Sequence, residues 1–265
     1  MTDPESSRRA GAAQDSDHVA RQRRFYGSRA HRALQPRVGD LYVSKLASAL
    51  VSALGIESHH RVLEVGAGFG RFTFALLEHC GSVTALDLSE TALESLDAVR
   101  ESRGIGVERC RTIHSDLDTV SADDLGAPYD FVLGFFVLHH LEDVGASIDR
   151  LARFAVPGGG IGFLEPNRWN PLYAVQVTCC PDMTWSEEKG VWRLSPRGVM
   201  QSYRQSGLEP QPVHYLGFFP PQLVNRFAWA RRLEAMLERQ AWLGGVLPFL
   251  ILSARVPPRG DDSSR

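Results

Sequence analysis

Residues 61–72 read RVLEVGAGFGRF, a short apolar run with Glu64 near its end, followed by glycines at positions 66, 68 and 70. The apolar run predicts a buried strand, and the glycines predict a tight turn whose backbone approaches a ligand closely. A dinucleotide is one interpretation, but the dinucleotide fingerprint places its third glycine where this chain has Arg71. Glu64 would also repel a pyrophosphate. These residues favour a ligand with positive charge, such as one carrying an amine and a sulfonium.

Short apolar runs alternate with helical patterns from residue 61 onward. The expected strands are RVLEV, SVTALD, RCRTIHSD, YDFVLGFF and GIGFLE, and the expected helices are FTFALLEH, ETALESLDAVRE and ASIDRLARF. This alternation predicts an α/β fold, with a parallel sheet and helices on both faces. Ser89 is the expected N-cap of the second helix, with Glu90 in its first turn. The run from Pro157 to Gly160 is expected to end a later helix.

Acidic residues follow the next two expected strands. Asp87 ends SVTALD, and Asp116 follows the third strand. Ligands of open parallel sheets bind beyond the carboxyl ends of the strands, where the strand order reverses. The pattern Glu64-x-Gly66-x-Gly68-x-Gly70, with these two acids, resembles class I S-adenosylmethionine-dependent methyltransferases over residues 60–165. The resemblance implies S-adenosylmethionine as cofactor and a Rossmann-like, seven-stranded, mostly parallel sheet whose last strand is antiparallel.

The resemblance also implies roles for individual residues. Asp87 would bind the ribose hydroxyls, Asp116 would accept from the exocyclic amine of adenine, and two leucines would flank the ring. YDFVLGFFVLHHLED, residues 129–143, resembles the fourth motif of the family, with Phe135 against the cofactor. The expected cofactor-binding residues are Glu64, Gly66, Ala67, Gly68, Gly70, Asp87, Leu88, Asp116, Leu117 and Phe135.

Two adjacent histidines, His139 and His140, follow the fourth expected strand. Methyl transfer from a sulfonium is an in-line displacement that needs alignment and exclusion of water. A general base is needed only when the nucleophile carries a proton. Histidine titrates near neutral pH, so one of this pair is the candidate catalytic base. In the alternative, one histidine packs against the sheet and the other caps the next helix.

The expected substrate contacts are Tyr26, Glu165, Trp169 and Tyr173, although a structural role is an equal alternative for Tyr26 and Glu165. All five tryptophans, at positions 169, 185, 192, 229 and 242, follow Glu165. They predict either an aromatic-rich cap over an apolar pocket or the core of such a cap. The expected substrate is a small, partly hydrophobic molecule. Methylation of an oxygen on a secondary metabolite is favoured, and methylation of a carbon on a quinone-like or activated ring comes next.

The predicted domain organisation has one methyltransferase domain between two tails. Residues 1–18 are polar and predict a disordered N-terminal tail, and residues 257–265 predict a loose C-terminal tail. The domain itself, residues 19–256, is divided into N-terminal helices (19–58), the cofactor-binding core (60–165), a lid insertion (166–194) and C-terminal helices and strands (195–256). Connections as long as 166–194 are usually functional lids. Ser195 and Pro196 predict the start of the helix that follows it.

A late helix is expected from Pro221 to Gln240, before a final strand in PFLILSARV. The residues expected on its apolar face are Leu223, Phe227, Ala230, Leu233 and Leu237. The residues expected opposite are Arg226, Arg231, Arg232 and Arg239, which outnumber Glu234 and Glu238. A solvated face is one interpretation, and peripheral contact with an anionic membrane or an acidic lipid-like substrate is the other.

Composition excludes several classes of protein. The chain has 265 residues, 43% of them hydrophobic, and a formal net charge of −2, which disfavours nucleic acid as a partner. Its four cysteines show no zinc spacing and no disulfide framework, so we expect a cytoplasmic protein without a metal. The apolar run WLGGVLPFLIL is too short to span a bilayer. The remaining alternatives are an NAD-dependent oxidoreductase and a protein that binds S-adenosylmethionine without catalysis.

Overall fold

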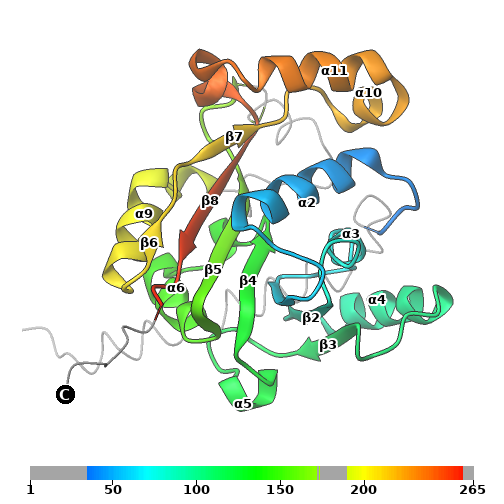
Figure 1. Cartoon of the computed structure of the whole chain (residues 1–265), viewed down its shortest axis with the longest axis vertical. Helices are drawn as coiled ribbons and strands as arrows, with labels where there is room; N and C mark the ends of the chain where they lie inside the picture. Colours follow the sequence, from blue (N-terminus) through cyan, green and yellow to red (C-terminus); the bar gives the residue numbers. More distant parts are fainter. Residues whose placement is uncertain (1–34, 172, 174–189, 259–265) are drawn as a thin grey trace, which may run out of the picture.

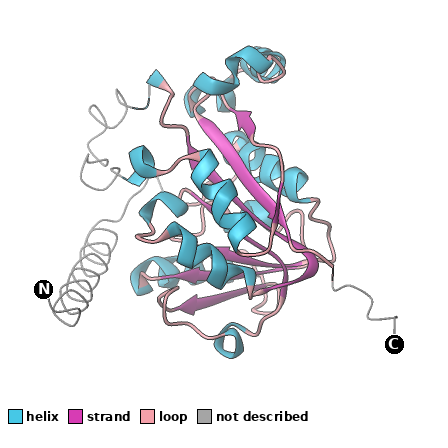
Figure 2. Cartoon of the chain, turned by 90° about the vertical axis from the view of Figure 1, so that its left-hand side faces the viewer, coloured by secondary structure: helices cyan, strands magenta, loops and turns pink. Residues whose placement is uncertain are grey.

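The computed structural model describes residues 35–171, 173 and 190–258 (Figures 1 and 2). Its strands are β1 (Arg61–Val65), β2 (Ser82–Asp87), β3 (Cys110–His114), β4 (Tyr129–Phe135), β5 (Ala155–Pro166), β6 (Glu209–Pro210), β7 (His214–Leu216) and β8 (Phe249–Arg255). Its helices are α2 (Leu41–Leu54), α3 (Thr73–Leu76), α4 (Glu90–Ser102), α5 (Ala122–Leu125), α6 (Val144–Ala152), α9 (Pro196–Gln205), α10 (Pro221–Arg226) and α11 (Ala228–Leu237), with 3-10 turns η1 (Leu138–His140) and η2 (Ala241–Val246). The expected N-terminal tail and most of the expected lid lie outside the described residues.

The strands form one sheet in the order β3-β2-β1-β4-β5-β8-β6, with β7 also paired to β8. The pairings among β1 to β5 are parallel and β8 is antiparallel to β5, which confirms the predicted α/β fold. β6 and β7 pair with successive parts of β8, because Pro210 lies opposite Ala254 and His214 lies opposite Ile251. The two short strands therefore share one edge of β8, and the described part of the chain fills the seven strand positions expected.

Helices cover both faces of the sheet (Figure 1). Side chains of α2, α3 and α4 join one apolar layer, and side chains of α6 and α9 join the other. Val62 and Leu63, neighbours in β1, point into opposite layers and are both fully buried. Alternation of this kind places apolar side chains on both faces of a central parallel strand. The sheet is therefore rigid where its strands end in the glycine turn and the other candidate residues.

Local capping signals explain where the helices begin. The side chain of Ser89 accepts a hydrogen bond from the backbone N–H of Ala92, as predicted for the start of α4. Ser195 accepts in the same way from Gly198, and Pro196 takes the first position of α9. Asp40 caps α2 through a bond from the N–H of Val43. These caps fix the ends of helices that pack against the strands.

The structure corrects two predictions about local elements. Residues 157–160 do not end a helix but lie within β5, where Gly160 pairs with both Phe131 and Arg255. A Cβ on Gly160 would lie 3.2 Å from the carbonyl oxygen of Ala254, so glycine suits this close strand pairing. The single helix expected over 221–240 is broken at Phe227, which has extended backbone angles (φ −121°, ψ 120°) between α10 and α11.

The segment that contains α10, α11 and η2 connects β7 to β8 and lies at one end of the molecule (top of Figure 1). β8 begins at Phe249, which pairs with Pro166 at the end of β5. Because β8 runs antiparallel to β5, this segment joins the sheet at the carboxyl edge of the parallel strands. No helix among the described residues is long and apolar enough to cross a bilayer.

Candidate active site

The glycine turn follows β1 directly and adopts left-handed backbone angles. Gly66, Gly68 and Gly70 have φ values of 71°, 52° and 80°. A Cβ on Gly66 would lie 2.6 Å from Val137, and a Cβ on Gly70 would lie 2.7 Å from Leu96, so both are packed against neighbours. A Cβ on Gly68 would meet nothing within 4 Å. Gly68 is therefore the position where the turn exposes its backbone to open space.

Glu64 lies in β1 with only 2% of its surface exposed. Its Oε2 accepts a hydrogen bond from the hydroxyl of Thr73 at 2.5 Å. Burial raises the pKa of Glu64 from 4.5 to about 8; the Thr73 bond opposes this shift and the charge of Asp87 adds to it. A buried carboxyl of this kind gains most from a cation placed beside it.

Asp87, at the end of β2, links the glycine turn to the next helix. Its Oδ2 accepts from the backbone N–H of Gly68 at 2.7 Å, and its Oδ1 accepts from the N–H of Ser89 at 2.8 Å. Burial raises the pKa of Asp87, while these backbone hydrogen bonds lower it. Each carboxylate oxygen retains a second acceptor site. Two parallel acceptors beside a glycine turn are suited to a vicinal diol.

The third strand brings Asp116 to the same edge. The N–H of Ser115 donates to the carbonyl of Asp87 at 3.2 Å, so the ends of β2 and β3 are joined. Asp116 is partly buried and its Oδ1 accepts from the N–H of Asp118. Leu117 is buried in the apolar layer that contains α6, whereas Leu88 is only partly buried. The structure thus brings together the acidic residues that the sequence analysis selected.

The end of β4 makes a strained turn toward η1. Phe136 has φ 55°, an uncommon value for a residue with a bulky side chain, and its N–H donates to the carbonyl of Leu164 at 2.8 Å. The ring of Phe135 stacks on Phe72 with centroids 4.1 Å apart. Strain of this kind clusters at functional sites, where surrounding contacts maintain it. Here it directs the chain from β4 to the two histidines.

Glu165 holds the turn after β4 with both carboxylate oxygens. Oε1 accepts from the N–H groups of Val137 and Leu138 at 3.0 and 2.7 Å. Oε2 lies 2.5 Å from Nδ1 of His139. Glu165 is fully buried and His139 is 4% exposed. Glu165 therefore anchors the turn and the histidine, and its contact with a substrate stays a prediction.

The remaining predicted residues occupy varied surroundings. His140 is partly buried, with its ring centroid 4.0 Å from that of His139. Trp169 is 65% exposed, whereas Tyr173 is 6% exposed and packs with Val191. Tyr26, like Trp185, lies outside the described residues. The four described tryptophans are between 39% and 78% exposed, so they do not form the core of a cap.

A line of aromatic rings that the sequence analysis missed adjoins the turn after β4. From Phe72, which stacks on Phe135, the line continues to Phe136 at 5.8 Å. Phe136 lies 5.3 Å from Phe249, and Phe249 lies 6.3 Å from Tyr42. These rings come from the turn after the glycines, β4, β8 and α2. No sequence pattern joins them, since only the folded sheet brings the four segments together.

Comparisons with known proteins agree with this geometry. A family profile described as a methyltransferase domain matches residues 63–161. The ubiquinone biosynthesis O-methyltransferase of Bordetella avium is 30% identical over 168 residues, which are 60% of this chain and 66% of that protein. An uncharacterized methyltransferase of Mycobacterium bovis is 28% identical over 164 residues, 61% of this chain and 77% of that protein.

Solved structures share the fold. A SAM-dependent methyltransferase from Aquifex aeolicus superposes with a TM-score of 0.55 at 15% identity, over 79% of this chain and 89% of that one. The geranyl diphosphate C-methyltransferase from Streptomyces coelicolor superposes with a TM-score of 0.56 at 14% identity, over 80% of this chain and 79% of that one. With the glycine turn and the acids at successive strand ends, these findings place the chain among the class I S-adenosylmethionine-dependent methyltransferases. The cofactor of the protein is S-adenosylmethionine.

The residues present fit this cofactor. Space beside Gly68 would leave room for the cofactor at the backbone, and the two Asp87 oxygens would suit the ribose hydroxyls. Glu64 offers a buried carboxyl for positive charge. When bound, S-adenosylmethionine supplies an electrophilic methyl group on a positively charged sulfur. The class excludes the alternative of an NAD-dependent oxidoreductase.

Proposed function

We propose that the protein transfers a methyl group to a hydroxyl of a small, partly hydrophobic acceptor, with His139 as general base and Glu165 as its positioning residue. The observation that carries this proposal is the contact between His139 and Glu165 at the end of β4 and β5. A buried histidine oriented by a carboxylate is the arrangement by which enzymes activate hydroxyl nucleophiles. The relative from B. avium, named as an O-methyltransferase, supports the choice of oxygen.

In this proposal Nε2 of His139 is the nitrogen that accepts the proton. Nδ1 faces the Glu165 carboxylate at 2.5 Å. In the neutral imidazole, Nδ1 donates its proton to that carboxylate, so Nε2 is the nitrogen with the accepting lone pair. As the acceptor oxygen attacks the methyl carbon, its proton passes to Nε2 and the carboxylate stabilises the imidazolium that forms. Glu165 holds the ring in place throughout.

The cofactor-binding residues hold the methyl donor in this proposal. Glu64 balances the positive charge of the methionine portion, and Asp87 binds the ribose hydroxyls. Asp116 accepts from the adenine amine, with Leu88 and Leu117 on either side of the ring. Phe135, at the end of β4, lies against the cofactor. Their task is to align donor and acceptor, because a sulfonium is already a good leaving group.

The aromatic line supports a partly hydrophobic acceptor. Phe72, Phe136 and Phe249 come from three segments of the carboxyl edge of the sheet, close to the turn that carries His139. Aromatic walls with a few polar groups are typical of small-molecule sites. A phenol or catechol combines a flat apolar ring with an acidic hydroxyl. This chemistry makes a phenolic ring the acceptor class that the site fits best, with carbon methylation of an activated ring as the second candidate.

The test is to incubate the protein with S-adenosylmethionine labelled in its methyl group and with a panel of phenols, catechols and hydroquinones. Mass spectrometry then identifies labelled products, and fragmentation distinguishes a methoxy group from a ring methyl group. We expect methoxy products from wild type, and their formation should fall strongly in His139→Ala. A ring methyl product would overturn oxygen methylation. Full cofactor binding without any labelled product from this panel would favour the non-catalytic alternative and contradict the proposal.

A further inference from the structure

The segment between β7 and β8 presents an outer face of aromatic, apolar and basic side chains. On α11, Trp229, Arg232 and Met236 recur at spacings of three and four and thus share one side of the helix, and Arg239 follows in the turn after its end. All four are exposed, with Trp229 at 54% and Met236 at 55%. We call this surface, together with Phe218 and Phe227, the outer face.

The aromatic part of the outer face is continuous. Phe218 contacts Phe219 at 5.1 Å between ring centroids, Phe219 contacts Trp229 at 5.8 Å, and Trp229 lies 6.0 Å from Phe227. Phe218 is 41% exposed and Phe227 is 37% exposed. The guanidinium of Arg226 lies 5.7 Å above the Phe227 ring. Exposed aromatic side chains that contact one another form a patch, and such patches are typical of interaction surfaces. Single exposed apolar residues are not.

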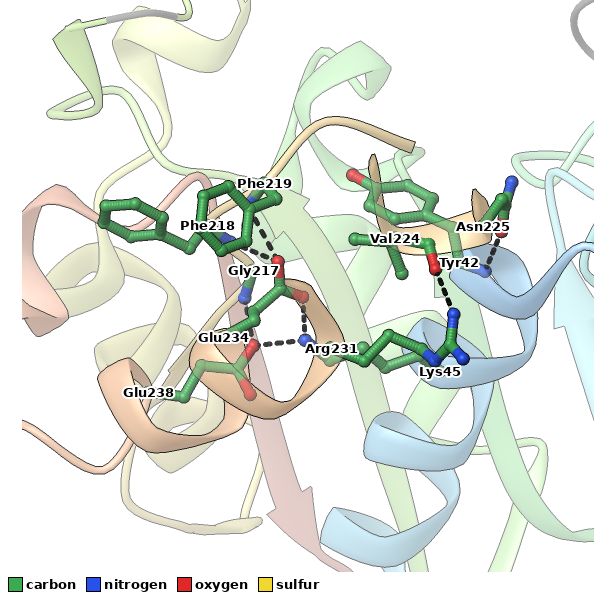
Figure 3. A network of polar contacts seen from close by, with 10 residues as sticks. All are labelled: Tyr42, Lys45, Gly217, Phe218, Phe219, Val224, Asn225, Arg231, Glu234 and Glu238. Carbon is green, nitrogen blue, oxygen red and sulfur yellow. Dashed lines mark hydrogen bonds and ion pairs between the residues drawn. The ribbon is translucent and has the colours of Figure 1, made fainter. Parts of the chain in front are cut away.

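The acidic residues of α11 point away from the outer face. Glu234 is fully buried, where it accepts from the N–H groups of Phe218 and Phe219 and forms an ion pair with Lys45 of α2 (Figure 3). Glu238 accepts from the N–H of Gly217 and lies 2.6 Å from Lys45. This corrects the prediction that both acids share the polar side with the arginines. Both acids therefore lie on the inner side beside Lys45, while Arg232 of α11 and Arg239 in the turn after it are exposed.

The outer face belongs to the same edge of the molecule as the candidate active site. Asn167, two residues after Glu165, donates through its side chain to the carbonyls of Gly245 and Leu247. Asn170 donates to the carbonyl of Val246 at 2.6 Å. These bonds attach η2, which carries Trp242 at 78% exposure, to the end of β5. The segment between β7 and β8, which carries the outer face, is therefore attached through η2 to the strand end that anchors His139.

We propose that the outer face docks on the surface of a bilayer that contains anionic lipid. Trp, Phe and Met side chains would enter the boundary between headgroups and acyl chains, and the arginines would bind lipid phosphates. Arginine suits this position because its apolar stem stays with the aromatic side chains while its guanidinium reaches the phosphates. The absence of acids from the exposed side of α11 favours an anionic surface over a protein of mixed charge. Docking at this edge brings the candidate site close to apolar acceptors dissolved in the membrane.

The experiment is co-sedimentation of the whole protein with vesicles. One set contains phosphatidylcholine alone, and the other replaces part of it with phosphatidylglycerol. We expect the protein to sediment with the anionic vesicles and, at equal lipid, to bind the neutral ones more weakly. The double variant Arg232→Glu, Arg239→Glu should lower the fraction bound to anionic vesicles about tenfold or more, since each basic residue near the surface contributes to binding. Trp229→Ser should weaken binding to anionic vesicles at both low and high salt.

The matched control reverses two exposed arginines elsewhere, Arg153→Glu with Arg197→Glu. It makes the same change of net charge and should keep the binding of wild type. Circular dichroism confirms that each variant is folded before its binding is compared. Equal binding of the two double variants, or no binding of wild type to anionic vesicles, would overturn the proposal. Analytical ultracentrifugation without lipid gives the other decisive result: a stable dimer that Trp229→Ser dissociates would show that the outer face binds a second copy instead.

Discussion

The carboxylate of Glu165 joins β5 to the turn after β4, with Oε2 2.5 Å from Nδ1 of His139 and Oε1 accepting from two backbone N–H groups. The same side chain therefore sets both the path of the turn and the orientation of the imidazole. Because Glu165, Leu138 and His139 are buried, losing one partner leaves a buried polar group without its hydrogen bond. This coupling makes the function of Glu165 measurable separately from cofactor binding.

The first prediction concerns Glu165→Gln. The amide keeps an oxygen for the N–H groups of Val137 and Leu138, but presents an N–H toward Nδ1 of His139. That contact favours the tautomer with the proton on Nε2, which cannot accept the acceptor's proton. We expect kcat for a phenolic acceptor to fall by about 10² to 10⁴, the range for a lost general base, while the Kd for S-adenosylmethionine stays close to that of wild type.

Two further variants control this prediction. His139→Ala should lower kcat to a similar degree, and the double variant should be no worse than either single one, because the two residues act as a unit. His140→Ala should retain most of the rate. A normal rate in Glu165→Gln, or a larger loss in His140→Ala than in His139→Ala, would assign the base elsewhere.

The second prediction concerns Asp87→Ala. This change removes the acceptors expected for the ribose hydroxyls and also releases the N–H of Gly68, which Asp87 binds at 2.7 Å. We expect the Kd for S-adenosylmethionine, measured by calorimetric titration, to rise at least tenfold, since hydrogen bonds to charged groups contribute about 1.5–3 kcal/mol. Asp124→Ala is the control: its carboxylate is exposed and accepts a hydrogen bond from the backbone N–H of Ser121, the N-cap of α5. Equal affinities in the two variants would contradict a ribose-binding function.

Local signals in the sequence predicted much of the fold. Ser89 and Ser195 cap their helices as expected, because a cap depends on residues three positions apart. The glycine turn and the acid of β2 were also predictable, since a strand end and its loop are contiguous. The contact between Glu165 and His139 was not, because it joins residues 26 positions apart in the sequence, at the ends of two neighbouring strands. Sequence order alone does not say which side chain faces which across a sheet.

The late helix shows a different reason for a wrong prediction. Helical periodicity assigned Glu234 to a solvated face because charged residues are seldom buried alone. Its partner Lys45 lies 189 positions away, and the backbone amides at Phe218 and Phe219 complete the site. The burial of Glu234 therefore depends on contacts between segments far apart in the sequence. The break between α10 and α11 at Phe227 was also not predictable, because no proline or glycine lies near it in the sequence to indicate the end of a helix.

The third prediction compares two glycines of the turn. In Gly70→Ala the new Cβ would lie 2.7 Å from Cγ of Leu96 in a left-handed conformation, so strain and overpacking combine. We expect its free energy of unfolding to fall by about 2–5 kcal/mol, the sum of these two costs. In Gly68→Ala the Cβ enters open space, so only the left-handed cost of about 1–2 kcal/mol applies.

Gly68→Ala is expected to lose less stability than Gly70→Ala but to lose more affinity for the cofactor. The Gly68→Ala methyl group occupies the space through which S-adenosylmethionine is expected to approach the backbone, so its Kd should rise strongly although the protein stays folded. Urea unfolding and calorimetric titration measure the two properties separately. Unchanged cofactor affinity in Gly68→Ala would show that the cofactor does not approach the turn at this position.

The fourth prediction follows from the pKa of Glu64, which burial raises from 4.5 to about 8. Between these two pH values the folded protein holds a proton that the unfolded chain has released. The folded state then binds more protons, so the free energy of unfolding of the protein without cofactor falls as pH rises through this window. Glu64→Gln is neutral throughout and keeps an oxygen for Thr73. Its urea midpoint should therefore decline less than that of wild type over the same window.

Cofactor binding reverses this proton balance. A sulfonium and an amine beside Glu64 favour the carboxylate, so binding near neutral pH should expel the proton that the buried group holds without cofactor. Calorimetric titration in two buffers with different ionisation enthalpies measures that release directly. We expect close to one proton released by wild type, and correspondingly less by Glu64→Gln, where any remainder reports other groups such as Asp87. The release from Glu64 should disappear well above its pKa of about 8, where the carboxylate is already ionised. Equal release by wild type and variant near neutral pH would show that the positive charge of the cofactor is held elsewhere.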